Sequence, residues 1–218
     1  KADHWRHMVE AFKQAEGTIR IALVGKYVQL HDAYLSVTQA LLDAGYDMGR
    51  LVTIDYVDAE DLMDDGTLDA ALKDVHGIIV PGGFGERGIE GMIRASKYAR
   101  EHEIPYFGIC LGMQIAVIDI ERNIAGLKDA NSTEFDVNTP YPVIDLMEAQ
   151  VGVENMGGTQ RLGNYPCHLV EGSRAAKLYN DADILERHRH RYEFNNEFRG
   201  MLRKAGLAIA GINEDLDL

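Results

Sequence analysis

The sequence is poor in basic residues and in cysteine, and it has no long apolar run. Its 22 lysines and arginines stand against 35 acidic residues, which gives a formal net charge of −13 at pH 7. Such an acidic domain has no general attraction for a phosphate backbone, so nucleic-acid binding is not expected. Two cysteines, Cys110 and Cys167, are too few for a disulfide framework and fit a reducing, cytoplasmic setting. No run approaches the roughly 20 apolar residues of a membrane helix, and no signal peptide is recognisable.

The remaining composition is that of an ordinary globular domain. Hydrophobic residues make up 46% and charged residues 26% of the 218 residues. This length is enough for one good core, with room for a small insertion. The first residues, 3–15, have the pattern of an exposed amphipathic helix.

Short apolar runs alternate with helical patterns in the first part of the chain. The expected strands are 18–24, 50–57, 76–80 and 104–109, and the expected helices are 33–45, with Gly45 as a C-cap, 88–102 and 111–122. This alternation predicts an α/β fold, a flavodoxin-like three-layer sandwich around a mostly parallel central sheet. Ligands in such folds bind at the carboxyl ends of the strands.

The pattern changes after about residue 140. Short strand-like pieces at 141–147, 159–170 and 207–212 lie among turns, and they predict later strands that are partly antiparallel. The pair Gly157-Gly158 predicts a mobile loop.

The strongest chemical signal is the run Gly108-Ile109-Cys110-Leu111-Gly112, where an expected strand meets an expected helix. This is the nucleophile-elbow arrangement with sulfur in place of oxygen. A sharp turn needs glycines that allow close backbone approach, and the helix start favours thiolate. A lone cysteine is more often buried and structural, but two glycines at this junction favour a nucleophile.

A second glycine-rich turn, Pro81–Gly88, follows the third expected strand. Its main-chain N–H groups could face a developing negative charge. Alone the signal is weak, because no Gly-Lys-Ser/Thr follows and the P-loop pattern is not met. Beside Cys110, such a turn can supply the oxyanion-hole amide that the elbow lacks.

The pair of turns resembles the class I, triad-type glutamine amidotransferases, and within that family the chain looks closest to the CTP synthases. The matching stretches are VGKYVQLHDAYLSV (24–37), PGGFGERGIEGMI (81–93), GICLGMQ (108–114), NSTEF (131–135), GGTQRLG (157–163) and ERHRHRYEFN (186–195). They follow the family order over nearly the whole chain, and NSTEF and RHRHRYE are the most specific.

The resemblance implies a cysteine that attacks the side-chain amide of L-glutamine, forms a thioester and releases ammonia. Cys110 resembles this nucleophile, while Gly83 and Leu111 resemble the residues whose amides form the oxyanion hole and contact the glutamine. No metal site and no cofactor are expected in this domain. The alternatives are another class I amidotransferase or a γ-glutamyl hydrolase, and a non-catalytic regulatory relative.

The resemblance also implies which residues hold the ends of the glutamine. Gln114, Glu134 and Arg191 resemble the groups that bind its α-amino and α-carboxyl ends, and which group meets which end stays open. An acidic group for the ammonium and a donor fork for the carboxylate suit an amino acid. Glu134 alone would more often be a surface carboxylate, and the run 187–191 could be a solvated basic face or a phosphate patch.

In CTP synthases, loops like 85–91 and 157–161 are linked to activation by GTP. Thr159 and Arg161 are the first candidates for that role here, with Arg87 and Glu90 next; Arg161 could equally cap a turn. The resemblance implies a parent enzyme that aminates UTP to CTP with ATP and Mg²⁺, forms a homotetramer, and carries a synthetase domain. Residues 1–16 would be the linker helix from that domain, and 17–218 the amidotransferase domain.

The family's His-Pro-Glu stretch, which supplies a base for the thiol and a Glu that orients it, does not occur in these 218 residues. His168, His188 and His190 lie in segments that match other family features, so none of them is assigned as the base. We therefore expect the amidotransferase domain to be C-terminally incomplete here. Residues 1–218 by themselves should hydrolyse glutamine very poorly, because removing a base from such a pair costs several powers of ten in rate.

Overall fold

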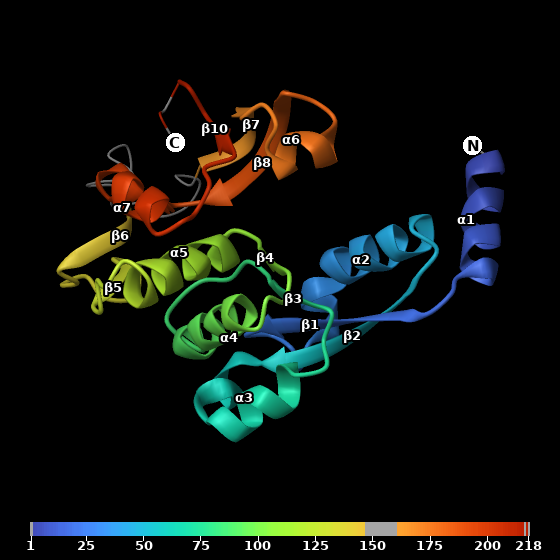
Figure 1. Ribbon diagram of the computed structural model, residues 1–218, viewed down its shortest axis with the longest axis horizontal. Helices are drawn as coiled ribbons and strands as arrows, with labels where there is room; N and C mark the ends of the chain where they lie inside the picture. The colour runs from blue at the N-terminus through green and yellow to red at the C-terminus, as the bar shows by residue number, and fades with distance from the viewer. Residues whose placement is uncertain (1, 147–160, 216, 218) are drawn as a thin grey trace. The chain divides into compact units, whose positions relative to one another are not determined.

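The computed structural model describes residues 2–146, 161–215 and 217 (Figure 1). The chain divides into two compact units, Lys1–Ala116 and Val117–Leu218. They are described separately below. No helix among the described residues is long and apolar enough to cross a membrane.

Among the described residues of the first unit, four strands form a parallel sheet in the order β2-β1-β3-β4. They are β1 (Thr18–Gly25), β2 (Leu51–Asp58), β3 (Gly77–Val80) and β4 (Tyr106–Gly108). Every residue of β3 is buried, as expected for a strand covered on both faces. The strands predicted from the sequence are confirmed to within two residues at each end.

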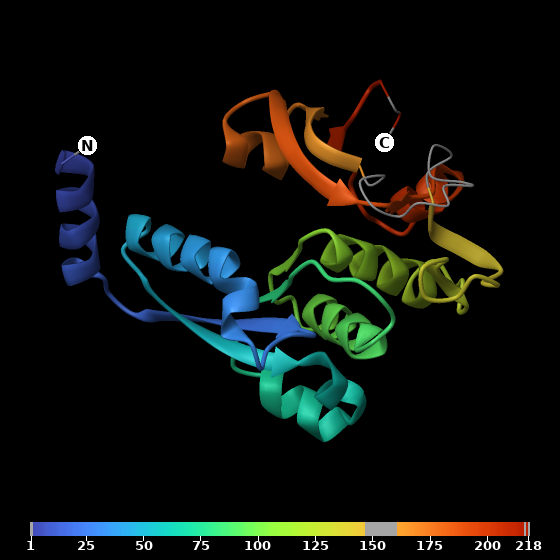
Figure 2. The ribbon, with the colours of Figure 1, turned by 180° about the vertical axis from the view of Figure 1, so that it is seen from behind.

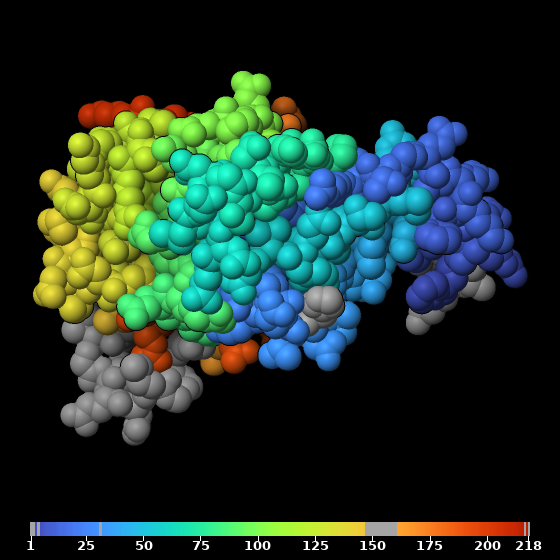
Figure 3. Space-filling view, turned by 90° about the horizontal axis from the view of Figure 1, so that it is seen from below, coloured from blue at the N-terminus to red at the C-terminus, as the bar shows by residue number. Residues whose placement is uncertain are grey.

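Helices cover this sheet on both sides. The first unit contains α1 (Ala2–Gln14), η1 (His31–Tyr34), α2 (Leu35–Asp47), η2 (Ala59–Met63), α3 (Asp65–Leu72) and α4 (Ile89–Glu101), and α5 (Leu111–Asn123) begins there. Figures 1 and 2 show α2 on one side of the strands and α3 on the other. Figure 3 shows the atoms of η2 and α3, in cyan, against those of α4, in green.

The core of the first unit forms where η1 and α2 meet the sheet. Leu23, Val28, Tyr34 and Ile79 are buried together there. The helix α2 runs to Asp47, so the prediction that Gly45 caps it was wrong. Gly45 instead lies where a Cβ would come within 2.5 Å of Val52 Cγ2, so its role is close packing of α2 on β2.

The described residues of the second unit form two small sheets. One has the order β5-β6-β9 and the other β10-β7-β8. The elements are β5 (Ala130–Ser132), β6 (Tyr141–Leu146), β7 (Arg161–Leu169), α6 (Arg174–Tyr179), β8 (Asp183–His190), β9 (Tyr192–Phe194), η4 (Asn196–Phe198), α7 (Arg199–Lys204) and β10 (Gly211–Ile212). Only β5 and β6 pair in parallel among these strands, which confirms the partly antiparallel character predicted for this region. The predicted loop at Gly157-Gly158 lies outside the described residues.

Candidate active site

Cys110 is the second of the two residues between β4 and α5, and its backbone is left-handed. Its φ is +53°, a region that non-glycine residues rarely adopt. Such a conformation costs about 1–2 kcal/mol for an L-residue, and strained residues of this kind gather at functional sites. Cys110 is partly exposed. The thiol is therefore carried on a sharp turn rather than enclosed in the apolar core.

The glycines two residues to either side of Cys110 are required by space. A Cβ on Gly108 would lie 2.3 Å from the carbonyl carbon of Gly112, and a Cβ on Gly112 would lie 2.0 Å from the carbonyl oxygen of Val80. Real Cβ atoms do not approach backbone so closely. The Gly-x-Cys-x-Gly pattern thus records a turn in which strand, helix and the neighbouring strand β3 touch through their backbones.

The start of α5 places main-chain donors beside Cys110. The N–H groups of Met113 and Gln114 donate to the carbonyl of Cys110 at 3.1 and 3.2 Å, and that of Gly112 donates to Ile109 at 2.9 Å. Helix N-termini carry positive partial charge and lower the pKa of adjacent thiols. Cys110 therefore lies at the positively polarised end of α5.

The glycine-rich turn that follows β3 lies directly against the Cys110 turn. Strands β3 and β4 are neighbours, with Val80 opposite Gly108, so both turns leave the carboxyl edge of the sheet side by side. A Cβ on Gly82 would lie 3.5 Å from Cys110 Cβ, and one on Gly83 would lie 3.2 Å from Leu111 Cδ2. Gly83 and Leu111, which the family resemblance pairs as oxyanion-hole residues, thus lie within contact distance of each other.

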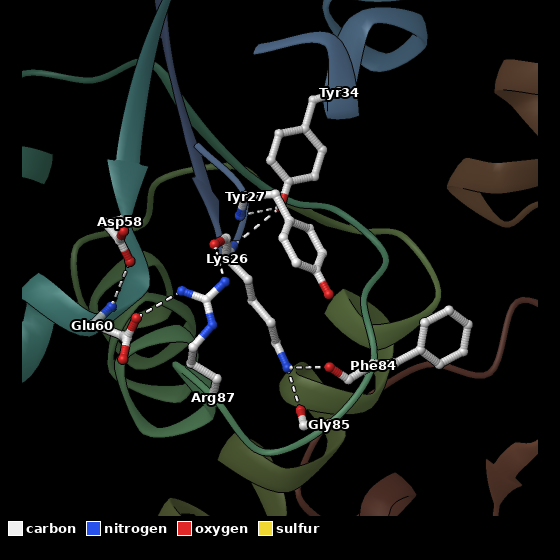
Figure 4. A network of polar contacts seen from close by, with 8 residues as sticks. All are labelled: Lys26, Tyr27, Tyr34, Asp58, Glu60, Phe84, Gly85 and Arg87. Atoms are coloured by element: carbon white, nitrogen blue, oxygen red, sulfur yellow. Dashed lines mark hydrogen bonds and ion pairs between the residues drawn. The ribbon is translucent and has the colours of Figure 1, made fainter. Parts of the chain in front are cut away.

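Two of the residues linked to GTP by resemblance lie at the far end of this turn. Arg87 is exposed, and its guanidinium lies 2.8 Å from Glu60 Oε2, donates to the carbonyl of Lys26 and covers the Tyr27 ring at 5.6 Å (Figure 4). The hydrogen bond to Glu60, followed by the nearby negative charges, raises the pKa of Arg87. Glu90 is exposed in the first turn of α4. Thr159 lies outside the described residues.

The residues expected to hold the glutamine fall in both units. Gln114, in α5, is 4% exposed. Glu134 and Arg191 are half-buried in the second unit, and the charges of both shift the pKa of Tyr192. Burial raises the pKa of Tyr192, the charge of Glu134 raises it further, and the charge of Arg191 lowers it. Glu134 and Arg191 therefore both lie near Tyr192 in the second unit.

The turn of Glu134 is fixed by its neighbours in the NSTEF stretch. Ser132 is fully buried, and its hydroxyl accepts a hydrogen bond from the N–H of Glu134 at 3.2 Å. The Thr133 hydroxyl donates to Asp145 at 2.6 Å. The specific sequence of this stretch therefore serves to hold the backbone around Glu134.

Arg161 is buried at the start of β7. It is 5% exposed, its Nη1 lies 2.6 Å from Glu193 Oε1, and its guanidinium covers the Tyr165 ring at 4.2 Å. Burial raises the pKa of Glu193, although the hydrogen bond from Arg161 opposes this. Burial also lowers the pKa of His190, and the Arg161 charge lowers it further. These groups form a buried polar cluster between β7, β8 and β9 that the sequence did not predict.

The run Arg187–Arg191 alternates along β8 and beyond. Arg187 and Arg189 are exposed, whereas His188 and His190 are partly buried and hydrogen-bond to each other at 2.7 Å. Within the described parts of the chain, no group of three potential metal ligands comes together. The solvated-face interpretation thus suits the exposed arginines, and the histidines belong to the Arg161 cluster.

A family comparison agrees with this geometry. The model of the class I glutamine amidotransferases matches residues 29–217. The chain belongs to the class I glutamine amidotransferase family. The Cys110 turn and the glycine-rich turn beside it both lie within the matched residues.

Individual relatives show which amidotransferases this chain is similar to. A CTP synthase of Caldanaerobacter subterraneus is 57% identical over 97% of this chain, and one of Staphylococcus epidermidis is 52% identical over 98%. The chain spans 39% and 40% of the length of these two relatives.

A solved structure described as the Trypanosoma brucei CTPS glutaminase domain with bound acivicin has a TM-score of 0.82 and 42% identity. The match covers 90% of this chain and 75% of that one. The predicted fold, and the predicted resemblance to the glutaminase domain of CTP synthases, are both confirmed.

Proposed function

We propose that this chain releases ammonia from L-glutamine through a thioester on Cys110, and that the ammonia aminates UTP to CTP with ATP. The observation that carries the proposal is the left-handed Cys110 backbone, flanked by obligatory glycines and by a second glycine-rich turn. A structural cysteine has no need of this strain, whereas a nucleophile that must project from a turn does.

In the proposed reaction the Cys110 thiolate attacks the side-chain amide carbon of glutamine. The amides of Gly83 and Leu111 donate to the oxygen as it gains charge, which stabilises the tetrahedral intermediate. The first amides of a helix have no acceptor within the helix, so the Leu111 N–H suits this role. The C–N bond then breaks, and the nitrogen takes up the proton that the thiol lost and leaves as ammonia. Water then releases glutamate from the thioester.

Charged and amide side chains of the protein are assigned to select the substrate by binding its two charged ends. We propose that Gln114, Glu134 and Arg191 hold the α-amino and α-carboxyl groups. A carboxylate suits the α-ammonium group of an amino acid, and a guanidinium suits its α-carboxylate. The thiol also needs a base, and the His-Pro-Glu stretch that serves the family is not among these 218 residues. No residue of this chain is assigned that role.

The remaining properties belong to the whole enzyme. Relatives more than twice as long imply a separate synthetase part, which would bind ATP, Mg²⁺ and UTP. We further propose activation by GTP through Arg87, Glu90, Thr159 and Arg161, a homotetramer, and a cytoplasmic location. Of the described members of this set, Arg87 and Glu90 are the exposed ones.

The test uses the longest form of the protein that its gene encodes, with Cys110→Ala beside the wild type. We expect the wild type to release glutamate and to form CTP from UTP with either glutamine or ammonium chloride as nitrogen source. Cys110→Ala should lose the glutamine-dependent reaction by several powers of ten and keep the ammonia-dependent one. Cys167→Ala, which changes the other cysteine, is the matched control and should keep both.

Each alternative predicts a different pattern. A γ-glutamyl hydrolase would release glutamate without converting UTP under either nitrogen source. A non-catalytic relative would release no glutamate, and an electrophilic glutamine analogue would leave no adduct on Cys110 by mass spectrometry. Glutamine-dependent CTP formation that survives in Cys110→Ala would refute the assignment of the nucleophile.

A further inference from the structure

Lys26 is a buried cation at the edge of the sheet that carries Cys110. It follows Gly25, the last residue of β1, and is 3% exposed. Lysine is almost never fully buried unless its ammonium group has partners, because removing a charge from water is expensive. Its burial therefore calls for a specific interaction, and the proposed reaction scheme gives Lys26 no part.

The ammonium group of Lys26 hydrogen-bonds to the glycine-rich turn. Its Nζ donates to the carbonyl of Phe84 at 3.1 Å and also to the carbonyl of Gly85 (Figure 4). Two consecutive carbonyls are thus held toward one cation. Hydrogen bonds from a charged donor are about twice as strong as neutral ones, so they fix the peptide planes on which they act.

The aliphatic stem of Lys26 fills the space next to Gly83. A Cβ on Gly83 would lie 3.6 Å from Lys26 Cδ and 3.7 Å from Lys26 Cε, while its other near neighbour is Leu111. Gly82, one residue earlier, would bring a Cβ to 3.5 Å from Cys110 Cβ. The turn is therefore held between Lys26 on one side and the Cys110–Leu111 segment on the other.

The backbone of Lys26 is itself anchored. Its N–H donates to the Tyr34 hydroxyl at 3.1 Å, and that hydroxyl also accepts from the N–H of Tyr27 at 3.1 Å. The carbonyl of Lys26 accepts from Arg87, which closes the far end of the turn. Figure 4 shows these bonds converging on Lys26 from η1 and from the turn itself. The side chain thus extends from a fixed point.

We infer that Lys26 is a positioning residue for glutamine hydrolysis, because its ammonium group and stem hold the turn that presents the Gly83 amide beside Cys110. The inference rests on the proposed function. Oxyanion donors act by being fixed in place before charge develops, and a displacement of about 1 Å can lower the rate about 100-fold. Without the cation, the Phe84 and Gly85 carbonyls lose their shared donor, and the turn loses one of the contacts that fix it.

The test compares wild type with Lys26→Met in the longest form of the protein that its gene encodes. Methionine keeps most of the stem and removes the donor. We expect kcat for glutamate release to fall about 10- to 100-fold while KM changes less than about threefold. Ammonia-dependent CTP formation should be unchanged.

Two electrophiles separate positioning from general damage to the site. A chloromethyl ketone analogue of glutamine reacts when Cys110 sulfur bonds to carbon and chloride leaves, and its ketone oxygen uses the oxyanion donors. Iodoacetamide alkylates the thiolate by direct displacement and does not need them. Lys26→Met should slow the ketone by about the same factor as kcat/KM and leave alkylation by iodoacetamide within about twofold.

The matched control is Lys97→Met, because Lys97 is a half-exposed lysine of α4 paired with Glu101, and it should match wild type in every assay. If Lys26→Met melts below the assay temperature, Lys26→Gln, whose amide can still donate one bond, replaces it with a smaller loss expected. Wild-type ketone labelling in the variant, or equal slowing of both electrophiles, overturns the inference alone. A wild type that releases no glutamate refutes the proposed function and the inference with it.

Discussion

Substituting Gly112 by alanine tests the reason why the Cys110 turn has its sequence. The added Cβ would lie 2.0 Å from the carbonyl oxygen of Val80 and 2.9 Å from its carbonyl carbon. Both neighbours are backbone, so neither can rotate away. A comfortable carbon–oxygen contact is about 3.3 Å, so the first turn of α5 must move away from β3 by about 1.3 Å.

The expected loss of stability is moderate, because two effects oppose each other. Forcing extra volume into a packed site costs about 1–3 kcal/mol, while alanine gains about 1 kcal/mol over glycine in a helix. The net destabilisation of up to about 2 kcal/mol should lower Tm by about 2–8 °C in a domain of this size. The displaced turn carries Cys110 away from Gly83, which should slow labelling by a glutamine-like electrophile about 100-fold.

Gly91→Ala provides the matched control for this prediction. A Cβ on Gly91 would lie 1.7 Å from the carbonyl oxygen of Ala59, an equally severe overlap between α4 and η2. We expect it to lower Tm at least as much and to leave Cys110 labelling, measured well below Tm, nearly unchanged. If Gly112→Ala labels at the wild-type rate, or if Gly91→Ala slows labelling equally, the close approach at Gly112 does not set the position of the nucleophile.

Predictions for substitutions at four further sites follow from the same structure. The Cys110→Gly variant should equal or exceed Cys110→Ala in Tm, because φ at position 110 is +53°. Gly200 in α7 has free space where a Cβ would lie, so Gly200→Ala should be more stable than the wild type by up to about 1 kcal/mol. Thermal scans of both pairs check these two expectations. Burial raises the pKa of Glu121, whose carboxylate oxygens find no hydrogen-bond partner among the described residues. The folded state therefore holds that proton more tightly and stability falls as pH rises above about 4.3, so Glu121→Gln should raise the unfolding free energy more at about pH 7 than at about pH 4 in urea titrations. The hydrogen bond that the His168 ring donates to Asp183 raises the pKa of His168, so the stabilising effect of this pair is full below about pH 6.5 and is lost as pH rises through the folded pKa. His168→Gln should flatten the pH dependence of Tm across that window, and an unchanged slope would contradict the pairing.

The first unit could be predicted closely from the sequence because its strands and glycine-rich turns have clear local sequence signals. The strands β1 to β4 are apolar runs of the right length, and both glycine-rich turns follow strands directly. Parallel neighbours share one carboxyl edge, so the meeting of the Gly82-Gly83 turn with Cys110 followed from the order of elements. The sequence analysis assigned no element to α3, although Asp64 caps this helix by accepting from the N–H of Thr67; Gly66 within its first turn weakens the local helix signal.

The second unit was predicted less well because its strands bury polar groups. Along β8 the inward positions include Glu186, His188 and His190, so the apolar alternation that marks a strand is absent. Their partners come from segments distant in sequence: Arg161 meets Glu193 across 32 residues. A sequence read locally can show that these residues are charged, but it cannot show that they neutralise one another.

Two residues of the first unit that break local rules, Cys110 and Lys26, lie at the carboxyl edge of its sheet, and this is a reason to regard that edge as the reactive one. Cys110 has a backbone that suits glycine, and Lys26 is a buried cation that supports a turn instead of facing water. Each feature would be selected against in a merely structural role, because each lowers stability or raises its dependence on a single contact. Their combination makes sense if the sheet edge is built to hold one sulfur and one amide in fixed register. Cys110→Gly should therefore gain stability and Lys26→Met should lose activity, and both changes lie at the same edge of the same sheet.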